Sequence, residues 1–347
     1  MVFSQKLAGN PTIIAEVAQA HDGSLGTAHA LVEAAARAGA DGVKFQTHIA
    51  AAESTLDEPW RVKFSPQDKT RFDYWRRMEF SPGQWGELAV HARELGLIFV
   101  SSPFSVRAVE LLEGLEVPFW KIASGEVANP ELLEAVWATG RPVVFSSGMS
   151  DLKELDRAVE ETRQRGAEVA VLQCTTAYPC PPQQWGLNVM ARLKERYRCP
   201  VGFSDHSGDI HAGLAATALG AEMIEVHLTF HRRMFGPDVP ASLTVEDLAR
   251  LVEGARAIRS ALDNPVDKND LSPELNRLKT VFGRSWALAH NLSAGTVLTR
   301  EHLSLKKPGG GIPVSDLDRL LGRRLRLDKT ADRLLAWEDL DPDRSEP

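Results

Sequence analysis

Short apolar segments rich in β-branched residues alternate along the chain with longer segments whose apolar residues recur at the helical spacing. The short segments predict eight buried strands, at residues 12–17, 42–46, 98–102, 119–123, 143–146, 169–175, 201–204 and 223–227. The longer segments predict helices, among them residues 24–40 (which Ser24 can N-cap), 81–96 and 244–262. Several helical segments end at a glycine, where a positive φ causes little strain: Gly39, Gly96, Gly140 and Gly220. Eight strand–helix units predict a parallel (β/α)8 barrel, a TIM barrel, of about 260 residues.

A second module is expected after this barrel, which we place at residues 1–262. Residues 263–279 are polar and contain prolines, so we interpret them as a linker with about one helical turn. Residues 280–347 contain the turn sequences SLKKPGGGIP and LLGRRLRLDK between short candidate strands. This pattern predicts a small β-rich unit behind the large α/β domain.

Composition and charge narrow the range of partners. The chain of 347 residues has a formal net charge of −7 and no evident basic face, so we expect no nucleic-acid partner. No apolar run approaches the roughly twenty residues that cross a bilayer, and the N-terminus lacks a signal-peptide pattern. We therefore expect a cytoplasmic protein that binds a small molecule and no membrane. The three cysteines show no CxxC spacing and are interpreted as free thiols: Cys174, Cys180 and Cys199.

Polar and ionisable residues follow each predicted strand. The strand ends read AEVAQAHDGS, KFQTH, SSPFS, KIASGE, FSSGMS, QCTTAYP, GFSDHS and EVHLTF, and FGPD follows the last of them. Active sites of TIM barrels lie at the carboxyl ends of the strands, and core packing would not select polar groups at all eight ends. The pattern therefore predicts one shared binding site at that end of the barrel.

The residue types at the strand ends indicate the chemistry of this site. Lys44 and Lys121 could form a cationic pocket for phosphate or carboxylate oxygens, together with the hydroxyls of Ser124, Ser146 and Ser204. His206 and His227 end the last two strands, where their imidazoles could bind a divalent cation. Acid, base or hydroxyl-binding groups are available in Glu16, Glu126, Asp205, Glu225 and Asp238. Structural roles stay open for single positions: a structural carboxylate at Glu225, polar loop residues at His21 and His48, and packing residues at Trp60 and Trp75.

Taken in order, these motifs resemble the sialic acid synthase family, the phosphoenolpyruvate-dependent nonulosonate synthases. The resemblance covers nearly the whole chain, and the C-terminal module resembles the antifreeze-like (SAF) domain of many members. It implies a transferase that condenses phosphoenolpyruvate with open-chain N-acetylmannosamine or a related amino sugar, giving a nonulosonic acid and phosphate. It also implies a divalent metal, Mn²⁺ or Mg²⁺, on His206 and His227. A homodimer is implied, in which the SAF domain covers the partner's active site.

The resemblance further implies roles for individual residues. Positions that match the family's phosphate-binding residues are Lys121, Ser124, Ser146 and Ser204. Lys44 and Ser102 would meet the phosphoenolpyruvate carboxylate. Positions that match amino-sugar contacts are Gln46, Glu126, Tyr178 and Asp238. The catalytic candidates are Glu16, Lys44, Lys121, Glu126 and Asp205, and which carboxylate is the general base stays open.

Three positions depart from the family pattern. Ala20 stands where the motif NHxGS has asparagine, so its amide is absent. Thr176 replaces the asparagine of CTNxYP, and one hydroxyl cannot imitate both ends of an amide. Lys307 replaces an arginine of the C-terminal module, and lysine lacks the planar fork for bidentate contacts. Thr176 and Lys307 are kept as substrate-contact candidates, and the departures favour a different sugar over a different reaction.

Three alternatives remain open at this point. The chain could be a legionaminate, pseudaminate or other nonulosonate synthase with its own sugar. It could be another phosphoenolpyruvate-dependent aldol-type synthase, such as a deoxy-octulosonate or deoxy-heptulosonate synthase. It could also be a non-catalytic scaffold, although that reading predicts decayed strand ends, and Lys44, Lys121, His206 and His227 are all present.

Overall fold

The computed structural model describes residues 10–269 and 272–342, and it divides into two compact units, Met1–Asn264 and Pro265–Pro347. The first unit contains an eight-stranded parallel sheet in the order β3-β2-β1-β8-β7-β6-β5-β4. The strands are β1 (Thr12–Ala18), β2 (Gly42–Thr47), β3 (Ile98–Pro103), β4 (Trp120–Ile122), β5 (Val143–Ser146), β6 (Val169–Cys174), β7 (Val201–Asp205) and β8 (Met223–His227). Strands β3 and β4 are also in contact, so the sheet closes into the predicted TIM barrel.

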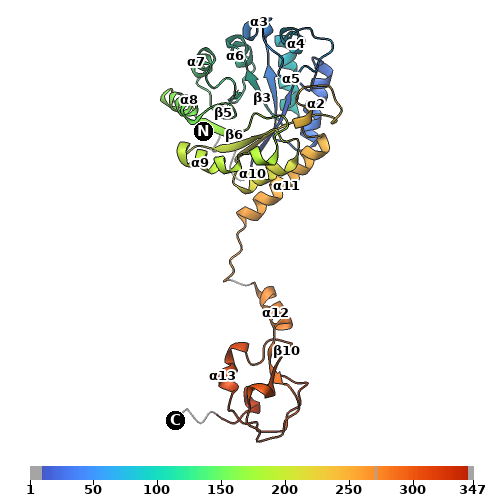
Figure 1. Ribbon diagram of the computed structural model, residues 1–347, viewed down its shortest axis with the longest axis vertical. Helices are drawn as coiled ribbons and strands as arrows, with labels where there is room; N and C mark the ends of the chain where they lie inside the picture. Colours follow the sequence, from blue (N-terminus) through green and yellow to red (C-terminus); the bar gives the residue numbers. More distant parts are fainter. Residues whose placement is uncertain (1–9, 270–271, 343–347) are drawn as a thin grey trace. The chain divides into compact units, whose positions relative to one another are not determined.

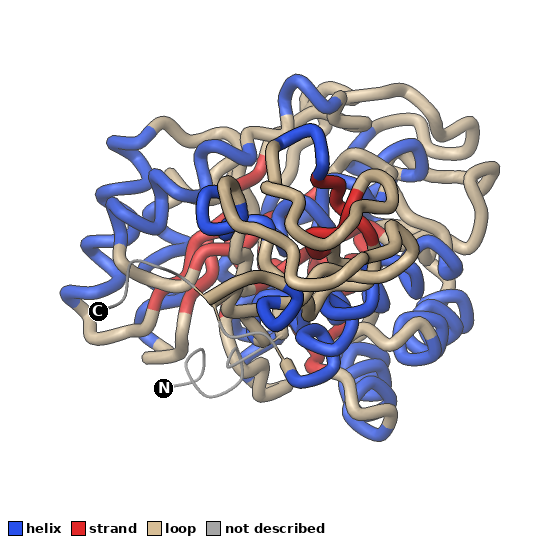
Figure 2. Tube along the Cα trace, turned by 90° about the horizontal axis from the view of Figure 1, so that it is seen from below, coloured by secondary structure: helices blue, strands red, loops and turns tan. Residues whose placement is uncertain are grey.

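One long helix follows each strand on the outside of the barrel (Figures 1 and 2). These helices are α2 (Leu25–Arg37), α5 (Pro82–Glu94), α6 (Val106–Glu113), α7 (Pro130–Ala138), α8 (Leu152–Gln164), α9 (Leu187–Tyr197), α10 (Ile210–Ala218) and α11 (Val245–Asp263). The segment between β2 and α5 is the longest connection and adds two short helices, α3 (Ala50–Glu53) and α4 (Arg71–Met78). Single 3₁₀ turns follow β6 and β8, at η1 (Pro182–Gln184) and η2 (Val239–Ala241).

Local sequence signals account for the helix ends. The Ser24 hydroxyl accepts a hydrogen bond from the Thr27 backbone and caps α2, as predicted, and such a cap stabilises a helix by about 1 kcal/mol. The four predicted helix-ending glycines all have positive φ: Gly39, Gly96, Gly140 and Gly220. The eight predicted strands are therefore present, and the helical segments begin and end close to their predicted bounds.

The barrel interior has two layers that differ in chemistry. Deep in the barrel lies an apolar layer, which we define as Ile14, Val100, Phe119, Val144, Ala170, Leu172 and Met223. Two residues further along the strands lies a polar layer, defined as Glu16, Lys44, Ser102, Lys121, Ser146, Ser204 and Glu225, all of them buried. Because side chains of a strand alternate between its two faces, the layers share the inner face while the other face packs on the helices. The polar layer thus lies at the carboxyl-terminal side, where the sequence predicted a site.

The second unit has its own small core. It contains the antiparallel pair β9 (Ser285–Leu288) and β10 (Leu303–Lys306), the helices α12 (Pro273–Phe282) and α13 (Leu317–Leu320), and the turns η3 (Arg300–His302), η4 (Val314–Asp316) and η5 (Trp337–Asp339). Its core residues are Trp286, Leu288, Leu298, Leu303, Ile312, Leu320, Leu325, Leu335 and Leu340. In residues 263–279, expected to hold about one helical turn, begins the ten-residue helix α12, which Ser272 caps and which continues to Phe282. Over residues 10–269 and 272–342, no helix combines the length and the apolar character needed to span a membrane.

Candidate functional site

Lys44 is the centre of one half of the polar layer. It lies on β2 opposite Glu16 of β1, and its ammonium group contacts the Glu16 carboxylate. Lys44 Nζ also donates to Ser102 Oγ at 3.3 Å and lies 3.7 Å from Glu225 Oε1. The second oxygen of Glu16 accepts a hydrogen bond of 3.0 Å from the Gln46 amide. The geometry brings together four residues that the sequence assigned to the site.

Lys121 forms the other half of the layer. Its Nζ donates to Ser146 Oγ at 2.7 Å and lies 3.6 Å from Glu225 Oε1. Ser204 Oγ donates to the same Glu225 oxygen at 3.1 Å. Glu225 therefore joins the two lysines inside the site, and whether its role is structural stays open.

Burial and neighbouring charges shift the pKa values in this layer. Burial raises the pKa of Glu16 to about 7, against the opposing effect of Lys44. Burial also acts on Glu225, but the two lysines hold its pKa below the usual value. Burial lowers the pKa of Lys121, whereas the carboxylates of Glu16 and Glu225 outweigh burial and raise that of Lys44. Glu16 can therefore exchange a proton near neutral pH.

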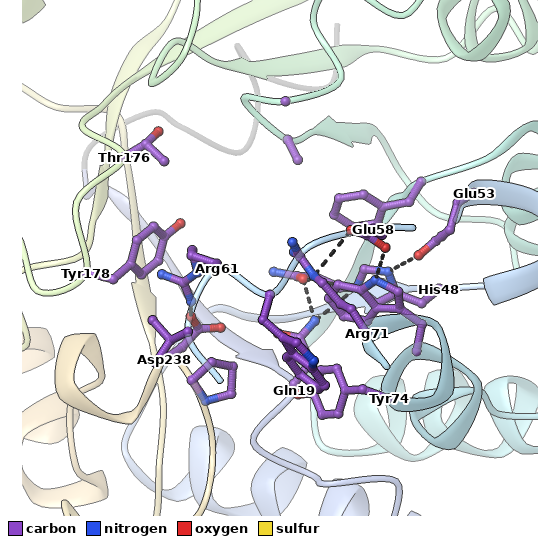
Figure 3. Close-up of a pocket in the computed structure, with 18 of the residues that line it drawn as sticks. Gln19, His48, Glu53, Glu58, Arg61, Arg71, Tyr74, Thr176, Tyr178 and Asp238 are labelled. Atoms are coloured by element: carbon purple, nitrogen blue, oxygen red, sulfur yellow. Dashed lines mark hydrogen bonds and ion pairs between the residues drawn. The ribbon is translucent and has the colours of Figure 1, made fainter. Parts of the chain in front are cut away.

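A cavity of about 340 Å³ lies over the polar layer. Gln46 and His227 line it, and on their strands they lie two residues beyond Lys44 and Glu225. Its volume is within the range of small-molecule sites. Figure 3 shows two groups on its walls: Thr176, Tyr178, Arg61 and Asp238 in one, and Gln19, His48, Glu53, Glu58, Arg71 and Tyr74 in the other.

Arg61 links the segment between β2 and α5 to the far wall of the cavity. Its Nη2 donates to Asp238 Oδ1 at 2.6 Å, and its guanidinium lies 4.3 Å from the centroid of the Tyr178 ring. Tyr178 in turn packs on His206, with ring centroids 4.1 Å apart. Two predicted sugar contacts, Tyr178 and Asp238, are thus held together by a residue that the sequence did not single out.

The two predicted metal ligands lie side by side. The ring centroids of His206 and His227 are 5.2 Å apart, and both residues are buried. Burial lowers the pKa of each to about 3, so both imidazoles are neutral at pH 7. The Nδ1 of His206 lies 3.0 Å from the carbonyl oxygen of Thr175, which can only accept, so this nitrogen carries the proton. The lone pair of His206 is consequently on Nε2, as a metal ligand requires.

His206 and His227 could hold a divalent cation only if a bound substrate or water supplied its remaining ligands. Among the described residues, no three His, Cys, Asp or Glu side chains are grouped so that they could hold a metal. The two neutral imidazoles would supply part of the coordination, and substrate or water the remainder. Glu225 Oε2, two residues before His227, is buried without a hydrogen-bond partner in the described part of the chain. An unsatisfied buried acceptor beside neutral imidazoles is consistent with a site that receives a cation.

Other candidates lie at the edge of the site or outside it. Asp205 lies between Ser204 and His206 on β7, so it faces the loop, where its oxygens accept from the Ser207 backbone and hydroxyl at 2.8 Å. Burial raises the pKa of Asp205 to about 6. At the rim, Ser124 Oγ lies 3.5 Å from Thr176 Oγ1, and Glu126 lines the cavity.

Lys307 belongs to the second unit. It is exposed, and its ammonium group lies 5.4 Å from the centroid of the Phe282 ring. Its role as a sugar contact stays a prediction. The three cysteines are free, as predicted, with Cys174 and Cys180 buried.

Several residues of the cavity escaped the sequence reasoning. His48 was weighed as a polar loop residue, and Trp60 and Trp75 as packing residues, but all three line the cavity. His21 lies in the turn after β1 and His48 directly after β2, so both are loop residues, but both are buried, and His21 packs on the Phe80 ring. Further wall residues that the sequence did not suggest are Gln19, Glu53, Glu58, Arg61 and Arg71. The one available signal was the unusual length of the segment between the second and third strands.

Comparisons with known proteins agree with this architecture. The NeuB family model matches residues 31–267, and the SAF domain model matches residues 283–341. N,N'-diacetyllegionaminic acid synthase of Campylobacter jejuni is 33% identical over 90% of this chain and 94% of its own length. Human N-acetylneuraminate-9-phosphate synthase is 33% identical over 95% of this chain and 92% of its own length. The crystal structure of N-acetylneuraminic acid synthetase from Leptospira borgpetersenii superposes with a TM-score of 0.68, at 29% identity, covering 78% of this chain and 91% of that one.

Proposed function

Because the chain belongs to the NeuB family, we propose that it condenses phosphoenolpyruvate with the open-chain aldehyde of an amino sugar, forming a nonulosonic acid and releasing phosphate. The observation that carries this proposal is the polar layer, where two buried lysines are each hydrogen-bonded to a serine beneath a cavity of sugar size. Such an arrangement suits a small polyanion, because ammonium and hydroxyl donors replace the water lost from its oxygens.

The two ends of phosphoenolpyruvate would bind different halves of the layer. Lys121 and its hydroxyl neighbours would hold the phosphate, and these neighbours are Ser124, Ser146 and Ser204. Lys44 and Ser102 would hold the carboxylate. This division fixes the enol carbon C3 toward the cavity, where the sugar aldehyde must lie. Gln46, Glu126, Tyr178 and Asp238, all on the cavity wall, are the proposed sugar contacts.

The reaction then needs one new C–C bond and one broken C–O bond. C3 of the enol attacks the aldehyde carbon, and water adds to C2 of the resulting oxocarbenium-like species, which forms a new C–O bond. Phosphate leaves from C2, so that C2 becomes a ketone whose oxygen comes from water. One proton of the water ends on the former aldehyde oxygen, which becomes a hydroxyl, and the other on the released phosphate. When bound by His206 and His227, a divalent cation, Mn²⁺ or Mg²⁺, would supply Lewis-acid polarisation of the aldehyde oxygen. Glu16 has a pKa of about 7 and lies beside Lys44, so it can hold or release the proton of the attacking water near neutral pH.

The second unit is proposed as a cover for the active site of a partner subunit, with Lys307 as its sugar contact. The proposal rests on the match of the SAF domain model and on the exposure of Lys307. Size-exclusion chromatography with light scattering should give a dimer. Removal of residues 265–347, a separate compact unit, should then abolish turnover. A fully active monomer would refute this part of the proposal.

The first test is phosphate release from phosphoenolpyruvate with Mn²⁺ or Mg²⁺ and four candidate sugars. The panel is N-acetylmannosamine, its 6-phosphate, mannose and a diacetamido sugar, and mass spectrometry should identify the nonulosonic acid. The names of the two relatives at 33% identity give different products, so the sugar of this chain has to be identified with the panel. Absence of phosphate release with every sugar, from a folded and metal-loaded protein, would contradict the proposal.

A further inference from the structure

A chain of hydrogen bonds between buried and half-buried side chains runs from the short helix α3 to the polar layer. His48 Nδ1 lies 2.6 Å from Glu53 Oε1, and His48 Nε2 lies 3.0 Å from the Gln19 amide nitrogen. The same amide nitrogen donates to Gln46 Oε1 at 2.5 Å, and Gln46 Nε2 donates to Glu16 Oε1 at 3.0 Å. Five side chains, from β1, β2, α3 and the loops that follow the two strands, therefore connect one carboxylate at the cavity wall with another beside Lys44.

The directions of these hydrogen bonds are not independent. A glutamine amide can turn over and an imidazole can exchange tautomers, so three of the five groups could each point either way. Carboxylates only accept, and one stands at each end of the chain. Glu53 requires the proton of His48 on Nδ1, which makes Nε2 an acceptor for the Gln19 amide. Gln19 then presents its NH₂ to Gln46, and Gln46 presents its own NH₂ to Glu16.

The surroundings of His48 hold its ring plane but not its tautomer. The imidazole is stacked between Trp75, with centroids 3.9 Å apart, and Phe104, with centroids 4.4 Å apart. Its side chain is 3% exposed and that of Glu53 is 8% exposed, so water does not compete for these bonds. Aromatic faces carry no directional preference between the two ring nitrogens. Each ring nitrogen faces one oxygen that only accepts: Glu53 Oε1 lies 2.6 Å from Nδ1, and Gln46 Oε1 lies 3.3 Å from Nε2. The shorter contact, to a carboxylate, places the proton on Nδ1.

The backbone brings Gln19 into this chain by an irregularity in β1. The register between β1 and β2 shifts between Glu16 and Ala18, and Ala18 has a φ of +44°, a conformation that costs a residue with a Cβ. The bulge directs the chain after Glu16 so that Gln19 reaches both Gln46 and His48. A strained backbone at this point is consistent with a functional constraint on Gln19.

We infer that His48 and Glu53 are positioning residues that orient the Glu16 carboxylate through Gln19 and Gln46. This inference rests on the proposed function, because Glu16 is taken as the group that exchanges the proton of the attacking water. Neither residue needs to touch the substrates for this role. With the amides reversed, Gln46 would turn its carbonyl oxygen toward Glu16, and the carboxylate would rotate away from its place beside Lys44.

Two conservative substitutions test the inference. Glu53→Gln keeps the shape but allows donation to His48, and His48→Phe keeps the aromatic stack but removes both nitrogens. Each should lower kcat by about 10- to 100-fold, the effect of losing a group that orients a reactive ligand, with both KM values within about threefold of wild type. Because the two residues act in one chain, the double variant should lose no more than either single variant.

A matched control comes from Glu79, whose Oε1 accepts from the Ala50 backbone at 2.8 Å and holds α3 without facing the cavity. Glu79→Gln should stay within about twofold of wild type. Equal losses in Glu79→Gln, additive losses in the double variant, or a raised KM for the sugar at unchanged kcat would each overturn the inference. Unchanged kcat in both single variants would do so as well.

A readout without turnover separates this inference from the proposed function. Nitrogen NMR of ¹⁵N-histidine-labelled protein should show His48 protonated on Nδ1 only, with the signal assigned by its loss in His48→Phe. Glu53→Gln should abolish this tautomer preference. A wild-type protein that releases no phosphate with any sugar would refute the proposed function alone, whereas an Nε2-protonated His48 would refute the hydrogen-bond chain alone.

Discussion

The apolar and polar layers of the barrel differ completely in chemistry although they are neighbours on the same strands. Ile14 and Glu16 on β1, and Phe119 and Lys121 around β4, are only two residues apart. The apolar layer is tightly packed: a Cβ added at Gly202 would lie 2.6 Å from Leu172 Cδ2. The polar layer instead buries two lysines and two glutamates in one group of ion pairs. Two residues along a strand thus separate the layer that packs the barrel interior from the layer that we propose to bind an anion.

The largest effect on turnover is expected from substitution of His206 or His227, which lie next to the polar layer. Replacing either by alanine should lower metal-dependent turnover by about 10³-fold, since Lewis-acid activation contributes several kcal/mol. Phosphate release measured against metal concentration checks this. His211→Ala, an exposed histidine on α10, is the control and should be unchanged. Full metal-dependent turnover in His206→Ala would remove the ligand assignment.

Lys121→Met tests whether the polar layer serves binding more than folding. The loss of one charged donor to the phosphate should reduce turnover by about 10²- to 10³-fold. Stability should change little, because Glu16, with its pKa of about 7, can take up a proton and balance the lost charge. Phosphate release measures the effect on turnover, and thermal unfolding measures the effect on stability. The control is Lys194→Met, because Lys194 is exposed and forms its ion pair with Glu222. An unfolded Lys121→Met protein would show that the layer is structural after all.

Leu172→Ala is the corresponding change in the apolar layer. Removal of a fully buried leucine should lower the free energy of unfolding by about 2–5 kcal/mol, while kcat per folded molecule stays nearly constant. Urea denaturation followed by circular dichroism gives the first value. Leu219→Ala, 60% exposed, should cost less than about 0.5 kcal/mol. A large fall in kcat at unchanged stability would contradict the separation of the layers.

The smallest effect concerns pH and Glu16. Its pKa of about 7 should rise further when an anion binds beside it, so binding of phosphoenolpyruvate takes up a proton. Affinity should then be full below about pH 7 and fall at higher pH, by at most tenfold per pH unit, until the raised pKa of the complex is passed. Titration calorimetry between about pH 6 and pH 9 measures this. In Glu16→Gln only the ionisation of the ligand itself should remain, and an identical pH profile in both proteins would exclude Glu16 as the proton acceptor.

The sequence was informative about the barrel because each strand and helix carries local signals. Alternation along the strands placed Lys44, Lys121 and Ser146 correctly at one end, and the same logic explains why Asp205, one position out of phase with Ser204, faces the loop. The proximity of His206 and His227 was predictable because His227 ends β8 and His206 directly follows its neighbour β7.

The cavity walls were not accessible in the same way. Arg61 contacts Asp238, which is 177 positions away in the sequence, and no local sequence pattern predicts such a contact. Gln19 depends on the shifted register after Glu16, which hydrophobic periodicity does not encode. Segments without regular structure take their conformation from tertiary contacts, so their residues could not be assigned before the fold was known.

The long connection between β2 and α5 supplies much of the cavity wall but none of the lysines of the polar layer. It begins and ends at elements of the barrel frame, and most of its buried apolar residues form a cluster of their own with Tyr74, Trp75 and Met78. Phe80, at its end, is the residue that it adds to the main barrel core. In evolution or protein engineering, the segment between β2 and α5 could therefore be exchanged for that of a relative. If the proposed function holds, its transplantation between relatives should change the acceptor sugar while the residues proposed to bind phosphoenolpyruvate stay the same.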